Sequence, residues 1–203
     1  MCSSDLLHAV FEAHLRGLRR WMAHSHDPLA VRSVASVFLS RVDTLVDKKL
    51  EALANAPGAD REAILNLRGK AALALAAQAY ALYQSTYHGE RFAELRELGA
   101  RPQNVLWAST ATKNPAYSDL LYVEDVMLPE TINTLPDATL AALADHAHIQ
   151  ARQPPSVATA QAHYANLAAL GIHMDESIAE DLQADGLHLF RLGFDALLTQ
   201  ANQ

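Results

Sequence analysis

The sequence contains almost no cysteine and no long hydrophobic run. Its single cysteine, Cys2, cannot form a disulfide within the chain, as expected in a reducing compartment. No apolar run reaches about 18 residues, and no basic segment precedes a shorter apolar run, so we expect neither a membrane span nor a secretory signal. Glycine and proline are also scarce, with 8 of each in 203 residues, which argues against fibrous and disordered classes. These absences predict a globular, cytoplasmic protein.

Positive charge is scarce as well. The chain has 16 Lys and Arg residues against 23 Asp and Glu residues, a formal net charge of −7. Nucleic acids and anionic membranes are bound through clustered Lys and Arg side chains, so we expect neither as a partner. A local site for a small anion is compatible with this charge.

The apolar pattern predicts mostly helices with a few short strands. Apolar residues three and four apart predict an amphipathic helix over residues 5–24. Strands are predicted at 33–39, 104–109 and 120–128, which are rich in Val, Leu and aromatic residues. Further helices are predicted from Val42 onward, over about 60–98 with a break near His88 and Gly89, and over 136–147, 157–170 and 175–199.

Strands that alternate with helices favour parallel pairing and therefore an α/β fold. Three strands are, however, less than half of a closed (β/α)8 barrel, which typically takes about 250 residues. The predicted strands therefore make neither a closed barrel nor a comfortable open sheet.

The first predicted strand ends directly before Arg41. By the period of two, Ser36 and Phe38 point to one face of this strand, and the aliphatic residues between them point to the other. In α/β barrels active sites form at the carboxyl ends of the strands, so Arg41 is a candidate anion clamp. The alternative is a surface ion pair of Arg41 with Asp43 or Asp47.

Four blocks of the sequence occur in a recognisable order. They are "SVASVFLSRVDTLVDKKL", "LRGKAALALAAQAY", "GARPQNVLWASTATKNPAYSDLLYVEDVMLPETINTLPDATLAAL" and "DLQADGLHLFRLGFDALL". Together they resemble the carboxyl-terminal half of a transaldolase, of the bacterial subfamily also found fused to glucose-6-phosphate isomerase. The resemblance covers roughly residues 5–199. It implies a (β/α)8 TIM barrel that transfers a dihydroxyacetone unit between sugar phosphates through a lysine Schiff base, without metal or organic cofactor.

The resemblance implies a single incomplete domain over residues 1–203. This domain would hold about strands six to eight of the barrel and the surrounding helices, with residues 156–203 as C-terminal helices that pack on the barrel. The family's Schiff-base lysine, acid/base aspartate and water-positioning glutamate lie on its fourth, first and third strands. We therefore identify no catalytic residue in this chain and expect the lysine in a missing segment.

The resemblance assigns substrate contacts to the first predicted strand. Ser36 and Phe38 match residues that line the family's substrate cavity, and Arg41 matches the arginine that holds the substrate phosphate.

The loop after the second predicted strand is also implicated. Ser109 matches a serine that approaches the phosphate. The best-known transaldolases have a second phosphate-binding arginine two residues further on, where this chain has Ala111, so we expect Lys113 to supply the charge. As a replacement Schiff-base lysine, Lys113 is placed better than Lys70, which we expect in an outer helix with its ammonium in water.

Two functions stay open from the sequence. The first is transaldolase chemistry of the pentose phosphate pathway, with this chain as the phosphate-binding half. Its substrates would be sugar phosphates of the class of fructose 6-phosphate, sedoheptulose 7-phosphate, erythrose 4-phosphate and glyceraldehyde 3-phosphate. The second is a catalytically inactive remnant or interaction module.

A half-barrel would expose sheet edges and an apolar interior. Such surfaces favour pairing with the missing amino-terminal half or self-association. We expect no metal site, because His146 and His148 are two residues apart and point to different sides of a helix.

Overall fold

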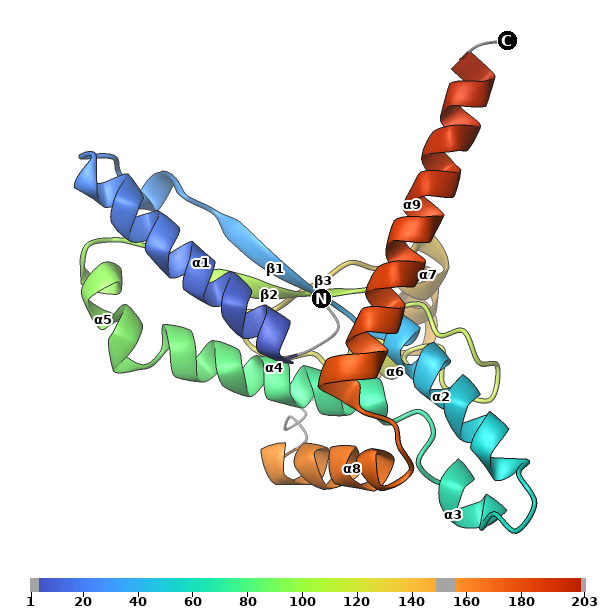
Figure 1. The fold of residues 1–203 in the computed structure, drawn as a ribbon. Coiled ribbons are helices and arrows are strands. Elements are labelled where there is room, and N and C mark those ends of the chain that lie inside the picture. Colours follow the sequence, from blue (N-terminus) through green and yellow to red (C-terminus); the bar gives the residue numbers. More distant parts are fainter. Residues whose placement is uncertain (1–3, 149–155, 202–203) are drawn as a thin grey trace.

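The computed structural model describes residues 4–148 and 156–201, which form a small parallel sheet with many helices around it (Figure 1). The strands are β1 (Ser33–Phe38), β2 (Gln103–Ala108) and β3 (Ile132–Asn133). The helices are α1 (Ser4–Ala23), α2 (Ser40–Ala54), α3 (Arg61–Leu65), α4 (Ala71–Tyr87), α5 (Glu90–Glu97), α6 (Leu121–Glu124), α7 (Asp137–His146), α8 (Val157–Ala169) and α9 (Ala179–Ala201). Within these described ranges, no helix is both long and apolar enough to cross a membrane.

The sheet is parallel throughout, in the order β1-β2-β3. Ser33 aligns with Gln103 at the start of the β1–β2 pair, and Phe38 aligns with Ala108 at its end. Helices connect each strand to the next, as parallel pairing requires. The prediction of a helix-rich α/β fold is therefore confirmed.

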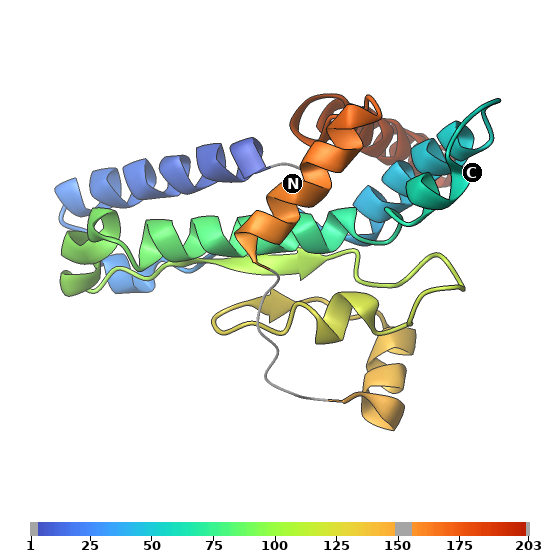
Figure 2. The same cartoon turned by 90° about the horizontal axis from the view of Figure 1, so that it is seen from below.

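One face of the sheet forms the core. Ala35, Val37 and Leu39 are buried there, as the period of two predicted, together with Val105 and Trp107 of β2. Helices α1 and α4 run side by side over this face and contact the strands (Figures 1 and 2). The opposite face of β1 is more open.

That open face carries the side chains of the candidate site. Val34 is 43% exposed, and Ser36 and Phe38 are half-buried. The sheet therefore has one face inside the core and one face available for a ligand or a further layer of chain.

The third strand lies elsewhere than the sequence predicted. Residues 120–128 form the short helix α6 and turns, and β3 is only two residues long. Tyr122 and Val126 are buried at a helical spacing of four, which explains why apolar composition without strict alternation misled the strand prediction. Asn133 belongs to this short strand and pairs with Trp107 in the sheet.

The long helical region predicted over residues 60–98 is three helices. The break near His88 and Gly89 is confirmed between α4 and α5, but a second break at residues 66–70 separates α3 from α4. Gly69 adopts a left-handed conformation there, with φ of 67°. Lys70 consequently precedes α4 instead of lying within a helix.

Replacing Gly69 with alanine should destabilise the fold by about 1–3 kcal/mol, since a Cβ at positive φ is strained. That Cβ would also lie 2.9 Å from Cζ of Tyr117, closer than van der Waals contact allows. Urea unfolding measures the loss. Gly17→Ala is the matched control, because a Cβ on Gly17 in α1 meets nothing within 4 Å and should stabilise the helix. Equal stability of the two variants would contradict the prediction.

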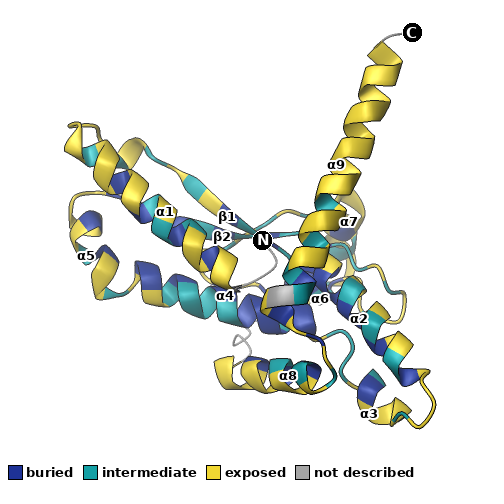
Figure 3. Cartoon of the chain, in the orientation of Figure 1, coloured by how far each residue is buried: buried dark blue, intermediate teal, exposed yellow. Residues whose placement is uncertain are grey.

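Most of the C-terminal helix projects away from the core. Figure 1 shows α9 extending beyond the other helices, and Figure 3 shows it mostly exposed, with partly buried residues only toward its start. None of its described residues is buried, and Phe190 and Phe194 are 80% and 62% exposed. Helix α8 packs against α4 and the start of α9 contacts α2, and the expectation that residues 156–203 pack on the barrel stays a prediction.

Candidate functional site

Hydrogen bonds connect the residues that follow β1 with those at the end of β2. The Leu39 backbone N–H donates to the Ala108 carbonyl at 3.0 Å, and the Ser40 N–H donates to the Ser109 carbonyl at 2.9 Å. The hydroxyl oxygens of Ser40 and Ser109 also lie 2.9 Å apart, at hydrogen-bond distance. Ser109 therefore sits at the start of α2, close to the end of β1.

Arg41 lies in the first turn of α2, directly after β1. Arg41 is exposed, and its guanidinium carbon is 5.2 Å from the centre of the Phe38 ring. This is a cation–π contact, which stabilises the position of the arginine side chain. The N–H groups at the start of α2 largely donate to backbone carbonyls, so the guanidinium is the group that can attract an anion here. Among the described residues, no ion pair within 4.0 Å joins Arg41 to Asp43 or Asp47, so the alternative prediction for Arg41 is wrong.

A cavity of about 480 Å³ contains Arg41 and Phe38. Its other wall comes mainly from α9, including Leu187 and Phe190. Ser36 lies two residues before Phe38 on the same face of β1. The structure therefore places Phe38 and Arg41 in one cavity, with Ser36 two residues before Phe38 on the same face of β1.

Lys113 lies in a different cavity. It lines a space of about 270 Å³ between α2 and the loop that follows β2, together with Thr44 and Lys48. Thr44 and Lys48 are three and seven residues after Arg41, on the adjoining side of α2. The structure thus places Lys113 beside the helix that carries Arg41, but outside the cavity of Arg41 itself.

Asp43 is a residue that the sequence prediction treated only as a surface partner. It is 1% exposed, and its carboxylate accepts hydrogen bonds from the Tyr122 hydroxyl at 2.7 Å and the Ala72 N–H at 2.9 Å. These bonds stabilise the ionised form, yet burial is the larger effect and raises the pKa of Asp43 to about 6. A buried carboxylate that changes charge near neutral pH is thus built into α2.

Asp47 repeats the same arrangement one helical turn later. Its carboxylate accepts hydrogen bonds from the Tyr117 hydroxyl at 2.6 Å and the Gly69 N–H at 3.0 Å, and burial raises its pKa. The two aspartates are four residues apart, so both lie on one side of α2, next to the core residues Val42 and Val46.

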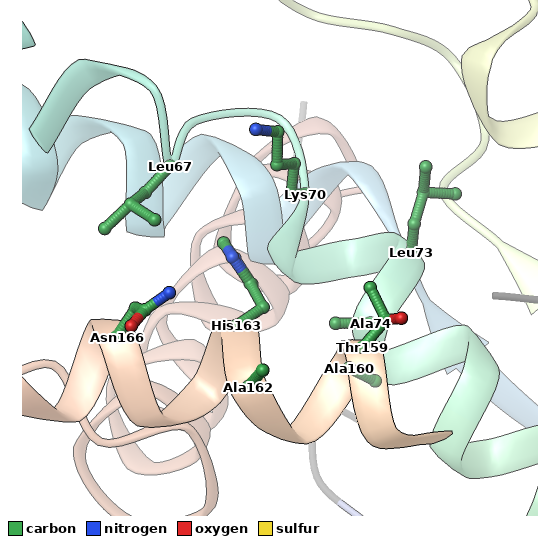
Figure 4. Close-up of a pocket in the computed structure, with 9 residues that line it drawn as sticks. All are labelled: Leu67, Lys70, Leu73, Ala74, Thr159, Ala160, Ala162, His163 and Asn166. Carbon is green, nitrogen blue, oxygen red and sulfur yellow. The ribbon is translucent and has the colours of Figure 1, made fainter. Parts of the chain in front are cut away.

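A further cavity, of about 370 Å³, lies between the start of α4 and α8 (Figure 4). It contains Lys70 and the buried side chain of His163, whose pKa is lowered by burial. The Lys70 ammonium is exposed and donates to the Asn66 carbonyl at 2.6 Å. This cavity is formed by helices away from the strand ends. Across the described residues, no group of three or more His, Cys, Asp or Glu side chains is arranged to hold a metal ion.

The parallel strands and the arginine at their carboxyl ends define an α/β protein with a candidate anion site. The Transaldolase/Fructose-6-phosphate aldolase family matches residues 6–201, so the chain belongs to this family, and the predicted relationship is confirmed.

Curated relatives agree with this family. The chain is 47% identical over 192 residues to a transaldolase of Thiobacillus denitrificans, across 95% of this chain and 52% of the relative. It is 42% identical over 190 residues to a transaldolase of Saccharopolyspora erythraea, across 93% and 50%. It is 39% identical over 202 residues to a transaldolase of Thermobifida fusca, across 99% and 53%. The chain spans about half the length of these relatives.

Proposed function

We propose that this chain supplies the phosphate-binding half of a transaldolase site. The observation that carries the proposal is Arg41, which lies at the carboxyl end of a parallel strand and rests on the Phe38 ring at 5.2 Å. A guanidinium presents a planar fork of donors that matches phosphate oxygens.

Ser36 and Ser109 complete the proposed site. Ser36 would line the path of the sugar on the open strand face, and Ser109 would donate its hydroxyl to the phosphate from beside Ser40. Lys113 would add positive charge from the neighbouring cavity. The substrates would be ketose and aldose phosphates, which share a phosphate at one end and hydroxyl groups along a short carbon chain.

The rest of the barrel would come from chain outside the printed sequence. Support comes from the three-stranded sheet, in which β1 and β3 each have one neighbour only among the described strands. The open face of β1 and the apolar surface of α9 would pair with that missing half, or with a second copy in its absence. The Schiff-base lysine would lie on the other half.

Borohydride trapping tests whether the phosphate site and the Schiff-base lysine lie on different polypeptides. The 203-residue chain is incubated with fructose 6-phosphate and reduced, alone and mixed with the part of the Thiobacillus denitrificans transaldolase that it does not match. We expect no adduct by intact mass from the chain alone, and an adduct on the added polypeptide in the mixture. Such trapping requires a free amine that forms a Schiff base with the ketone.

Two other outcomes would overturn the proposal. An adduct on the isolated chain that disappears in Lys113→Met would place the catalytic lysine here. No adduct in the mixture, although the two polypeptides form a complex, would favour an inactive interaction module.

A further inference from the structure

Two aspartates of α2 reach across to the segment that follows β2. Residues 109–122, here called the 109–122 segment, run from the end of β2 into α6. Asp47 accepts a hydrogen bond from Tyr117 of this segment at 2.6 Å, and Asp43 accepts one from Tyr122 at 2.7 Å. Both acceptors are on consecutive turns of one helix, so they fix the segment at two points along α2.

The same carboxylates also fix α2 to the start of α4. The second oxygen of Asp47 accepts the Gly69 N–H, and the second oxygen of Asp43 accepts the Ala72 N–H. Each aspartate therefore joins three parts of the chain, and both of its oxygens are used. A link of this kind defines orientation as well as distance, because neither carboxylate can turn without losing a bond.

These links decide where two of the proposed phosphate ligands lie. Ser109 and Lys113 belong to the 109–122 segment, whereas Arg41 belongs to α2. Lys113 lines the same cavity as Asp43 and Asp47 and is itself exposed. The placement of the segment relative to Arg41 therefore depends on the aspartates, as well as on the contact between Ser40 and Ser109.

We infer that Asp43 and Asp47 are positioning residues of the anion site. They hold the 109–122 segment against the helix that carries Arg41, and so fix where the proposed ligands of that segment, Ser109 and Lys113, lie relative to the arginine. This inference rests on the proposed function, since it assigns these residues a role in the same site. Neither aspartate contacts the substrate in this role.

Tyr117→Phe tests the inference with a single missing oxygen. The ring keeps its packing, but the Asp47 carboxylate loses its bond to the segment. We expect the affinity of the chain for fructose 6-phosphate, measured by isothermal titration calorimetry, to fall by about tenfold, as one charge-assisted hydrogen bond would predict. Amide hydrogen exchange in the 109–122 segment should become faster.

Tyr83→Phe is the matched control. Tyr83 is also a buried tyrosine whose hydroxyl donates to a carboxylate, Glu130, but it lies on α4 away from the 109–122 segment. Its substitution should leave the affinity and the exchange of the segment unchanged. A purely structural role of Tyr117 would instead lower stability without changing the affinity of the folded chain.

Substitutions of Asp47 distinguish loss of the hydrogen bond between Asp47 and Tyr117 from a general loss of structure. Asp47→Ala should weaken binding as Tyr117→Phe does, and the double variant should bind no more weakly than either single variant. Asp47→Asn should retain most of the affinity, because its amide can accept from Gly69 and donate to Tyr117.

The outcomes distinguish this inference from the proposed function. Binding that depends on Arg41 but is unaffected by Tyr117→Phe would overturn the inference alone. Absence of binding by the unmodified chain, or binding independent of Arg41, would overturn the proposed function and the inference together.

Discussion

Arg41→Ala should abolish measurable binding of fructose 6-phosphate, with a loss of affinity of at least about 100-fold. The guanidinium is the one group of the proposed site that offers a bidentate fork to the phosphate, and alanine removes both its charge and its donors. Loss of two charge-assisted hydrogen bonds corresponds to roughly 3 kcal/mol or more. Isothermal titration with fructose 6-phosphate and with inorganic phosphate gives the affinities directly.

Arg32→Ala is the control for nonspecific charge effects. Arg32 directly precedes β1 and Arg41 follows it, so the two arginines lie at opposite ends of the same strand. Removing Arg32 changes the net charge equally and should leave the affinity unchanged. Arg41→Lys should give an intermediate loss, because it keeps the charge and removes the fork. Equal losses in the Ala variants of Arg32 and Arg41 would remove Arg41 from the site.

The two longer strands were predictable because their composition matches their environment. β1 and β2 are short apolar runs with alternating burial, and each is bounded by turn or helix signals. The two-residue strand β3 has no period to detect. Its position depends on backbone bonds to Trp107, which accepts the Thr134 N–H at 3.1 Å. Such a strand is defined by its neighbour and not by its own residues.

Only those parts of the candidate site that depend on residues close together in the sequence could be predicted. The place of Arg41 after Phe38 followed from strand periodicity and from where α/β proteins bind ligands. The partners of Asp43 and Asp47 are tyrosines 79 and 70 residues further along the chain. No local pattern encodes such a pair, so the sequence offers these aspartates only as surface partners of Arg41, whereas the structure has them as buried carboxylates. The projecting position of α9 likewise depends on what surrounds it and not on its amphipathic sequence.

The ionisation of Asp43 should make the stability of the fold depend on pH. Burial raises the pKa of Asp43 from 3.8 to about 6, so the folded chain binds this proton more tightly than the unfolded chain does. The resulting stabilisation is complete below pH 3.8 and is lost as the pH rises through about 6. Its full size is on the order of 3 kcal/mol, at about 1.4 kcal/mol for each pH unit.

Other titratable groups lie around Asp43 and bear on how stability depends on pH. Tyr122 and Tyr117 from the 109–122 segment and Tyr164 from α8 have raised pKa values, mainly through burial, and stay protonated. Asp47, on the same helix, also has a raised pKa because of burial, and its contribution has the same sign.

Two histidines, one buried and one half-buried, oppose this trend. Burial lowers the pKa of His14 and His163, so their contributions increase as the pH rises. The free energy of unfolding of the unmodified chain therefore combines contributions that change with pH in opposite directions. Only a comparison between variants isolates the contribution of Asp43.

Asp43→Asn should consequently gain stability relative to the unmodified chain as the pH is raised from 4 to 8, by up to about 3 kcal/mol. The amide keeps an acceptor for the Ala72 N–H and carries no charge whose burial must be compensated. Urea unfolding, followed by the fluorescence of the buried Trp107, measures the difference at each pH. Asp195→Asn on the exposed surface of α9 is the control for the removal of one carboxylate. A pH-independent difference for Asp43→Asn would mean that the Asp43 carboxylate titrates alike in the folded and unfolded chains, and that its two hydrogen bonds offset its burial completely.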